Sequence, residues 1–261
     1  MKFLLKTLLA ALLSIVASGS FAHDFAVDGI YYVITSNKDK TVAVTCYGHI
    51  NYDVYYYKYE SDVNIPQTVT YNSTTYNVTS ITQNAFFRSP ALTSVIIPES
   101  VTSIGDAAFY LCSGLTSLTI PESVTSIGEK AFSGCSGLTS IVVQKNNTKY
   151  DSRNGSNAII ETSTNTLIAG CRNTVIPESV TSIGDWAFYG CSGLTSVTIP
   201  ESVILIGGSA FCKCTGLTSV TIPEGVTSIG SSAFSGCSGL TSVTIPNSVI
   251  SIGELAFCGC I

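Results

Sequence analysis

The first residues to consider are those that could act as acid, base or nucleophile. The chain of 261 residues contains two histidines, His23 and His49. A serine or cysteine nucleophile needs a general base within reach and a third group that orients this base. Neither histidine has such partners nearby, and the phrase Gly-Cys-Ser-Gly, superficially like a nucleophile turn, recurs several times. Catalysis needs one site, so we predict that the protein is not an enzyme.

The cysteines are the second candidate for chemistry. Six of the ten share one sequence phase: Cys112, Cys135, Cys191, Cys214, Cys237 and Cys260. A constant phase indicates that each fills the same small buried slot. Neighbouring strands lie about 4.8 Å apart, near the Cα separation of some disulfides, but stacked side chains point in parallel. We expect a ladder of thiols, with disulfides as the alternative in an exported chain; Cys46 and Cys171 fall outside the phase.

Two further patterns could hold a metal ion. The C-x-C pairs that begin at Cys212 and Cys258 lie two repeats apart and lack histidine partners. A column of glutamates recurs in one phase: Glu99, Glu122, Glu178, Glu201 and Glu224. Calcium takes about six to eight oxygen ligands, whereas each repeat offers one carboxylate, which favours a solvated edge. We predict no metal and no cofactor.

An internal repeat supplies the elements that would position any site. An Ala-Phe pair recurs with its phenylalanine at Phe86, Phe109, Phe132, Phe188, Phe211, Phe234 and Phe257. Five of the six steps are 23 residues long, and the sixth, 188−132 = 56, holds an insertion. A fixed period of this size is typical of a solenoid, because one repeat cannot bury its own apolar face and must stack on its neighbours.

Within one repeat, residues 115–135, the pattern predicts three parts. Alternation from Ser117 to Ile120 predicts a strand that points Leu118 inward and Thr119 outward. Proline 121 ends this strand, since it has no N–H for another hydrogen bond. A second short extended segment follows and ends at Gly128, which permits a bend. The Ala-Phe pair then packs onto the strands from a short helical turn.

The N-terminal residues differ from the repeats. Residues 1–22 have basic residues, a short apolar run and a Ser-Phe-Ala cleavage site, which predicts a secretory signal peptide; an uncleaved anchor is the alternative. Residues 23–62 predict a small β-rich cap, with strands at 25–27, 30–34 and 41–45. A tyrosine cluster in this cap indicates strand packing, with a sugar-stacking surface as the alternative: Tyr52, Tyr55, Tyr56, Tyr57 and Tyr59.

Residues 63–261 form the repeat region, interrupted at about 144–174. Residues 158–160 and 166–169 read as two strands of a β-hairpin that replaces part of one repeat. An insertion that breaks a regular array is a candidate contact element. The chain ends after an Ala-Phe-Cys phrase, so we expect the final repeat to be the least stable part.

The phrase Leu-Thr-Ser-Val-Thr-Ile-Pro, followed by Ser-Val-Thr-Ser-Ile-Gly-x-x-Ala-Phe-x-x-Cys, resembles the BspA-type leucine-rich repeats of bacterial surface proteins. Residues 92–261 carry the resemblance strongly and residues 63–91 more weakly. It implies an exported, right-handed leucine-rich repeat solenoid with a concave sheet. It also implies adhesion to matrix proteins or to other cells, at a secreted or cell-surface location.

The outward serines and threonines of the repeat strands are the predicted ligand-binding residues. They are Ser117, Thr119, Ser140, Ser196, Thr198, Ser219, Thr221, Ser242 and Thr244. Ser94 continues the first column, but Ile96 and Val142 replace threonine in the second. A neutral, hydroxyl-rich, extended face suits many weak contacts rather than one deep pocket. A threonine-rich strand is also expected from β-propensity alone.

Charge and composition narrow the partners. The net charge is −5 and only 11% of residues are charged, so there is no basic footprint for nucleic acid. No segment after the signal is long and apolar enough to span a membrane. We therefore predict a non-enzymatic protein that binds an extracellular protein or glycan, with oligomeric state open. A self-associating structural surface protein is the alternative, and ice binding is disfavoured because Ile96 and Val142 break the hydroxyl array.

Overall fold

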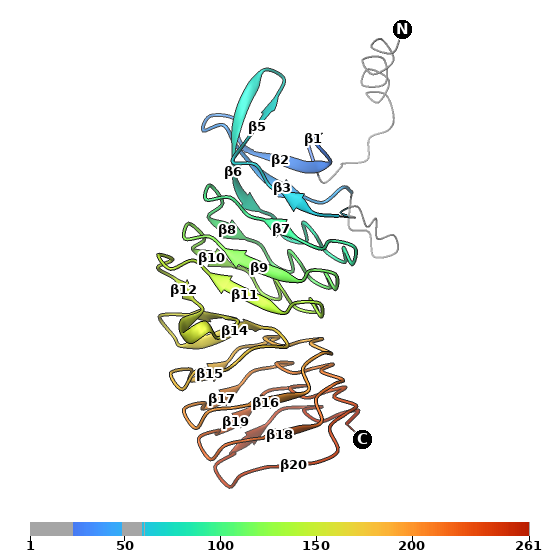
Figure 1. Ribbon diagram of the computed structural model, residues 1–261, viewed down its shortest axis with the longest axis vertical. Helices are drawn as coiled ribbons and strands as arrows, with labels where there is room; N and C mark the ends of the chain where they lie inside the picture. Colours follow the sequence, from blue (N-terminus) through green and yellow to red (C-terminus); the bar gives the residue numbers. More distant parts are fainter. Residues whose placement is uncertain (1–22, 49–58, 60, 261) are drawn as a thin grey trace.

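The computed structural model of the chain describes residues 23–48, 59 and 61–260. These residues form an elongated solenoid in which each coil stacks on the previous one, with a small β-rich cap at the N-terminal end (Figure 1). The predicted signal peptide, residues 1–22, lies outside the described residues. In the part that is described, no helix is long and apolar enough to cross a membrane.

The cap is an antiparallel meander that joins the solenoid edge to edge. Its strands are β1 (Phe25–Val27), β2 (Ile30–Ser36), β3 (Thr41–Thr45), β5 (Thr68–Tyr71) and β6 (Thr74–Ile81). The three strands expected before residue 46 are confirmed. Strand β3 pairs in parallel with β6, and β6 pairs in parallel with the first strand of the second face described below. The cap therefore continues the same sheet, and Tyr59 covers Phe86 with ring centroids 4.4 Å apart.

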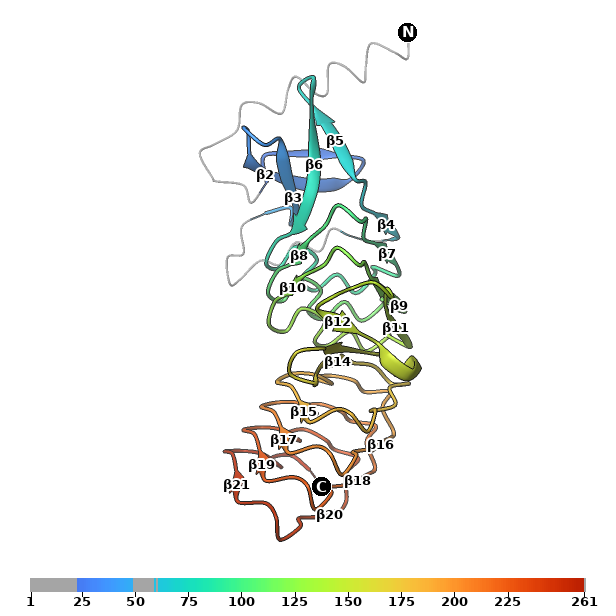
Figure 2. The ribbon, with the colours of Figure 1, turned by 90° about the vertical axis from the view of Figure 1, so that its left-hand side faces the viewer.

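Each coil contributes one strand to each of two faces (Figure 2). The first face holds β4 (Val63–Asn64), β7 (Val95–Ile96), β9 (Ser117–Ile120), β11 (Ser140–Val143), β16 (Ser196–Thr198), β18 (Ser219–Thr221) and β20 (Val243–Thr244). The second face holds β8 (Ser103–Ile104), β10 (Ser126–Ile127), β15 (Ser182–Ile183), β17 (Leu205–Ile206), β19 (Ser228–Ile229) and β21 (Ser251–Ile252). Adjacent regular coils pair in parallel with a register offset of 23 residues, as in Ser117↔Ser140.

The third side of each coil is a column of turns that carries the Ala-Phe pair. The predicted helical turn is a run of hydrogen-bonded turns instead, and the described residues contain a single short 3₁₀ helix, η1 (Arg153–Gly155). Backbone donors alternate: the Ala108 N–H bonds within its own coil to the oxygen of Gly105, whereas the Phe109 N–H bonds to the next coil, 2.7 Å from the oxygen of Ala131. This alternation ties each coil to the next.

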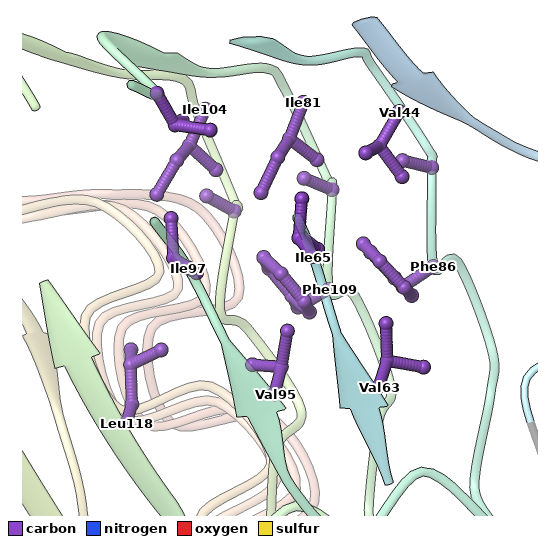
Figure 3. Packing of buried hydrophobic residues seen from close by; sticks show 14 of the residues in the cluster. Val44, Val63, Ile65, Ile81, Phe86, Val95, Ile97, Ile104, Phe109 and Leu118 are labelled. Carbon is purple, nitrogen blue, oxygen red and sulfur yellow. The ribbon is translucent and has the colours of Figure 1, made fainter. Parts of the chain in front are cut away.

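Leucine, isoleucine and phenylalanine side chains of successive coils form the core in rows. Phe86 and Phe109 lie between the rows of Ile81 and Ile104 on one side and of Val63 and Val95 on the other (Figure 3). The phenylalanine rings stack nearly parallel, with centroids 4.7 Å apart for Phe86 and Phe109. The predicted inward direction of Leu118 is confirmed, since only 2% of its surface is exposed.

A glycine that was expected to permit a bend has a different role. Gly128 does not have positive φ. A Cβ placed on it would lie 2.4 Å from the backbone nitrogen of Asp106 in the previous coil. The position requires glycine because two backbones approach each other closely there.

The insertion replaces a coil and divides the stack. It comprises β12 (Tyr150–Asp151), η1, β13 (Ala158–Glu161) and β14 (Thr166–Gly170). The predicted hairpin is confirmed, because β13 and β14 pair antiparallel, and β14 then pairs in parallel with β15 of the second face. Ile159 packs with the buried residues before it, whereas Ile160 packs with those after it. The hairpin is thus mostly core rather than a projecting contact element, and we call this junction the seam.

Candidate functional site

The predicted ligand-binding serines and threonines lie on the first face, which we call the ladder face. Strands β9 and β11 place Ser117 beside Ser140 and Thr119 beside Val142. Strands β16, β18 and β20 align Thr198, Thr221 and Thr244 in a single row. Parallel neighbours are about 4.8 Å apart, so each row offers a hydroxyl at every strand.

All but one of the predicted residues are exposed, and Ser140 is half-buried. The intervening residues, such as Leu118 and Val220, are buried in the core. Strand alternation therefore fixes the hydroxyls outward, because a slip of one residue would bury them and expose the apolar row.

Hydrogen bonding separates the ladder hydroxyls from their neighbours. The threonine before each ladder serine donates to a backbone oxygen one coil earlier, as Thr139 does to Thr116 at 3.1 Å and Thr218 to Thr195 at 3.3 Å. Among the described residues, no ladder hydroxyl has a hydrogen-bond partner within the chain. The first group holds the coils together, whereas the second is available to a ligand.

The rows are not continuous along the whole face. Strands β9 and β11 form one sheet and β16, β18 and β20 another, with the seam between them. At the N-terminal end, Ser94 is committed, because it donates to Asp62 Oδ1 at 2.7 Å. Hydrogen bonds from Thr93 and Ser94 lower the pKa of the Asp62 carboxyl. The candidate site therefore consists of two short ladders.

The sequence prediction missed two polar residues near the first ladder. The Asn173 amide donates to the oxygen of Thr139 at 3.1 Å, and the Arg172 guanidinium donates to that of Gly137 at 3.2 Å. They precede Ile176-Pro177, which repeats the Ile-Pro pair that ends each regular strand. This phase was the signal that could have placed them beside the ladder face.

The in-phase thiols form the expected ladder, and each bonds to a carbonyl in the previous coil. The Cys112 thiol donates to the oxygen of Phe86 at 3.0 Å, and Cys214 repeats the contact with Phe188 at 3.0 Å. All ten cysteines are free. Burial raises the pKa of Cys112 and of Cys237 to about 12, so these thiols are poor nucleophiles and act in packing.

The other candidates for chemistry are placed as follows. His23 packs against Tyr31, with ring centroids 4.7 Å apart, while His49 lies outside the described residues. Tyr59 is buried and donates to the oxygen of Thr45 at 2.9 Å; the other members of the tyrosine cluster lie outside the described residues. The glutamates of the column are exposed. Within residues 23–48, 59 and 61–260, no group of three or more acidic, histidine or cysteine side chains could hold a metal ion.

Comparison with solved structures returns leucine-rich repeat proteins. The pneumococcal vaccine antigen PcpA is 16% identical, with a TM-score of 0.57, over 94% of this chain and 80% of that one. A leucine-rich cell surface protein of Faecalibacterium prausnitzii A2-165 is 23% identical, with a TM-score of 0.47, over 95% and 87% of the two chains. A leucine-rich repeat protein of T. pallidum is 26% identical, with a TM-score of 0.48, over 90% and 88%.

Comparison with curated proteins gives no match. The family profile described as the BspA type leucine-rich repeat region matches residues 48–168 and 167–261, with six copies. Together these ranges span most of the chain, and the PcpA similarity supports the same solenoid fold. The chain therefore belongs to the BspA-type leucine-rich repeat family.

Proposed function

We propose that the protein is a secreted or surface-exposed, non-enzymatic binding protein that holds an extracellular protein or glycan on its ladder face. The observation that carries this proposal is the set of exposed hydroxyls in strand register with no partner within the described part of the chain. Such hydroxyls lose hydration when a ligand binds and regain hydrogen bonds from it, so affinity comes from many weak contacts.

Binding to immobilised matrix proteins and to mucin tests the proposal. Thr119→Lys and Thr221→Lys place a bulky charge on the ladder face, and we expect each to weaken saturable binding about tenfold or more. Ser126→Lys is the matched control, because Ser126 is an exposed serine in the same coil as Thr119 but on the second face. Saturable binding to none of these ligands, or an equal loss in the control, contradicts the proposal.

A second function, self-association into a surface array, is favoured by one feature of the second face. Where other coils have threonine or serine, two coils expose Ile204, Leu205 and Ile250; Ile250 is 87% exposed. Apolar side chains in this setting favour contact with another protein surface. Light scattering over a concentration series measures this: growth with concentration that Ile250→Thr abolishes supports the array, and a persistent monomer contradicts it.

A further inference from the structure

The seam contains a pocket that no regular coil has. Residues 127–133 form one wall and residues 184–187 the other, with Thr166 and Ile168 of β14 between them. The cavity has a volume of about 270 Å³. This is below the roughly 300–1,000 Å³ of pockets for drug-sized ligands, so there is room for a single small ring. We call it the seam pocket.

The pocket exists because the insertion separates two turns of the Ala-Phe column. The coils still meet at one point, where the Gly134 N–H donates to the oxygen of Tyr189 at 2.8 Å. Away from that point the ring stack is diverted: Phe188 packs over Gly170 of the hairpin, where an added Cβ would lie 2.1 Å from the phenylalanine Cε1. The turns of Phe132 and Phe188 are therefore splayed, and the space between them stays open.

The lining of the pocket is unlike the rest of the solenoid surface. It includes Trp186, the single tryptophan of the chain, which is half-buried. The Lys130 ammonium lies 4.4 Å from the centroid of the indole ring. Two exposed carboxylates, Glu129 and Asp185, complete the polar part. An aromatic surface is thus combined with hydrogen-bond donors and acceptors in one small space.

These polar groups retain capacity for a ligand. The only ion pair between described residues is that of Arg153 and Asp151, so Glu129, Lys130 and Asp185 form none there. One oxygen of Asp185 accepts from the Gly208 N–H, which fixes the orientation of the carboxylate and leaves the other oxygen available. The lysine–indole contact is weak at an exposed site, so a ligand can displace the ammonium from the ring and then bond to it.

We propose that the seam pocket binds a neutral sugar ring, which places its C–H face on Trp186 and its hydroxyls among Glu129, Lys130 and Asp185. A pyranose has one apolar face and a rim of groups that both donate and accept. The carboxylates accept from its hydroxyls, and the ammonium donates to them. The site is separate from the ladder face, so the proposal goes beyond the proposed function.

Charged ligands fit the same lining less well. A cation meets Lys130, and an anion meets Glu129 and Asp185. A zwitterion such as a free amino acid could pair with both signs, but charge pairs at exposed carboxylates contribute little in water. The neutral ring gains from the aromatic surface and from every polar group, which is why we commit to it.

The emission of Trp186 reports on this pocket directly, since no other tryptophan contributes. We would titrate the full chain with glucose, galactose, mannose and N-acetylglucosamine. At least one is expected to change the emission saturably, with half-saturation in the millimolar range typical of a small ligand in an open site. Glycine, glutamate and choline form the charged panel and are expected to give no saturable change.

Variants distinguish the pocket from a non-specific effect. Glu129→Gln should weaken binding about tenfold, because it removes a charged hydrogen-bond acceptor. Glu254→Gln is the matched control: Glu254 holds the same repeat phase in the last coil, is also exposed, and should leave binding unchanged. Trp186→Ala should abolish binding as measured by calorimetry, with circular dichroism confirming that the variant folds.

Three results overturn the sugar site. They are no saturable change with any sugar, saturation by the charged panel alone, and equal effects of Glu129→Gln and Glu254→Gln. The ladder-face variants Thr119→Lys and Thr221→Lys should bind sugar normally in this assay. Failure here therefore leaves the proposed function standing, and failure of the ladder-face experiment leaves the sugar site standing.

Discussion

The coils before and after the seam carry nearly the same phrase but end in different surroundings. We call them the N-terminal stack, with Phe86, Phe109 and Phe132, and the C-terminal stack, with Phe188 to Phe257. Ring centroids are 5.5 Å apart for Phe109 and Phe132 and 5.3 Å for Phe234 and Phe257, so the packing within each stack is alike. The difference lies at the ends.

In the N-terminal stack both ends are covered, by Tyr59 of the cap and by the insertion. In the last described coil of the C-terminal stack, Leu255 is 65% exposed and Phe257 is only partly buried. A repeat therefore takes its stability from its neighbours as much as from its own residues, as a chain of nearest-neighbour interfaces requires.

The largest expected effect tests this comparison directly. Phe109→Ala should lower the free energy of unfolding by about 3–5 kcal/mol, because Phe109 is fully buried between two stacked rings. Phe257→Ala removes the same side chain from a partly exposed site with one ring neighbour, and should cost about 1–2 kcal/mol. Urea unfolding followed by circular dichroism measures both, and Phe211→Ala should match Phe109→Ala. Equal costs for Phe109 and Phe257 would show that the ends do not differ.

The second prediction concerns how the insertion closes the N-terminal stack. The buried Asn147 amide donates to the oxygens of Pro121 at 2.8 Å and Val124 at 2.9 Å, and its oxygen accepts from the N–H groups of Lys149 and Tyr150, both at 2.9 Å. Asn147→Ala leaves several backbone groups without partners, and we expect a loss of about 2–4 kcal/mol. Chemical denaturation measures it.

A matched control for this variant is Asn146→Ala, since Asn146 is exposed beside it and should cost under about 0.5 kcal/mol. A small loss for Asn147→Ala would mean that water replaces the amide and that the insertion does not close the stack in this way.

The periodic part of the fold was predictable from the sequence, and the seam was not. Leu118 and the Ala-Phe column follow from a repeat that leaves one answer for each phase, and the hairpin follows from two apolar runs around a turn. The two-sided packing of Ile159 and Ile160 depends on which coil lies on each side of β13, and no local pattern records that. The same holds for the seam pocket, whose walls are 56 residues apart in repeat phase and meet only after the insertion has folded.

On the ladder face, strand alternation predicted which hydroxyls point outward but not which are committed. Ser94 has the same phase as Ser117, yet Asp62 from the preceding segment accepts its hydrogen bond. That contact joins residues 32 apart and lies outside the repeat. Sequence phase therefore gives direction, whereas availability depends on what the neighbouring coil supplies.

The smallest expected effect uses pH to compare the two stacks. Burial raises the pKa of Cys112 from 9.0 to about 12, so the folded chain keeps this proton between those values while the unfolded chain loses it. The stability that this thiol contributes is therefore complete below about pH 9 and declines toward pH 12, by about 1.4 kcal/mol per pH unit. Cys112→Ala should remove that slope, and Cys237→Ala in the other stack should do the same.

Cys260 and Cys258 show whether this slope reports burial. The pKa of Cys260 is also raised by burial, but its side chain is partly exposed, so Cys260→Ala should change the slope less than Cys112→Ala. Exposed Cys258 serves as the control, and Cys258→Ser should leave the slope unchanged. Urea unfolding from pH 8 to 10.5 under reducing conditions measures each slope. Similar slopes in all four variants would mean that the thiols are equally hydrated along the solenoid, which is incompatible with one covered stack and one open end.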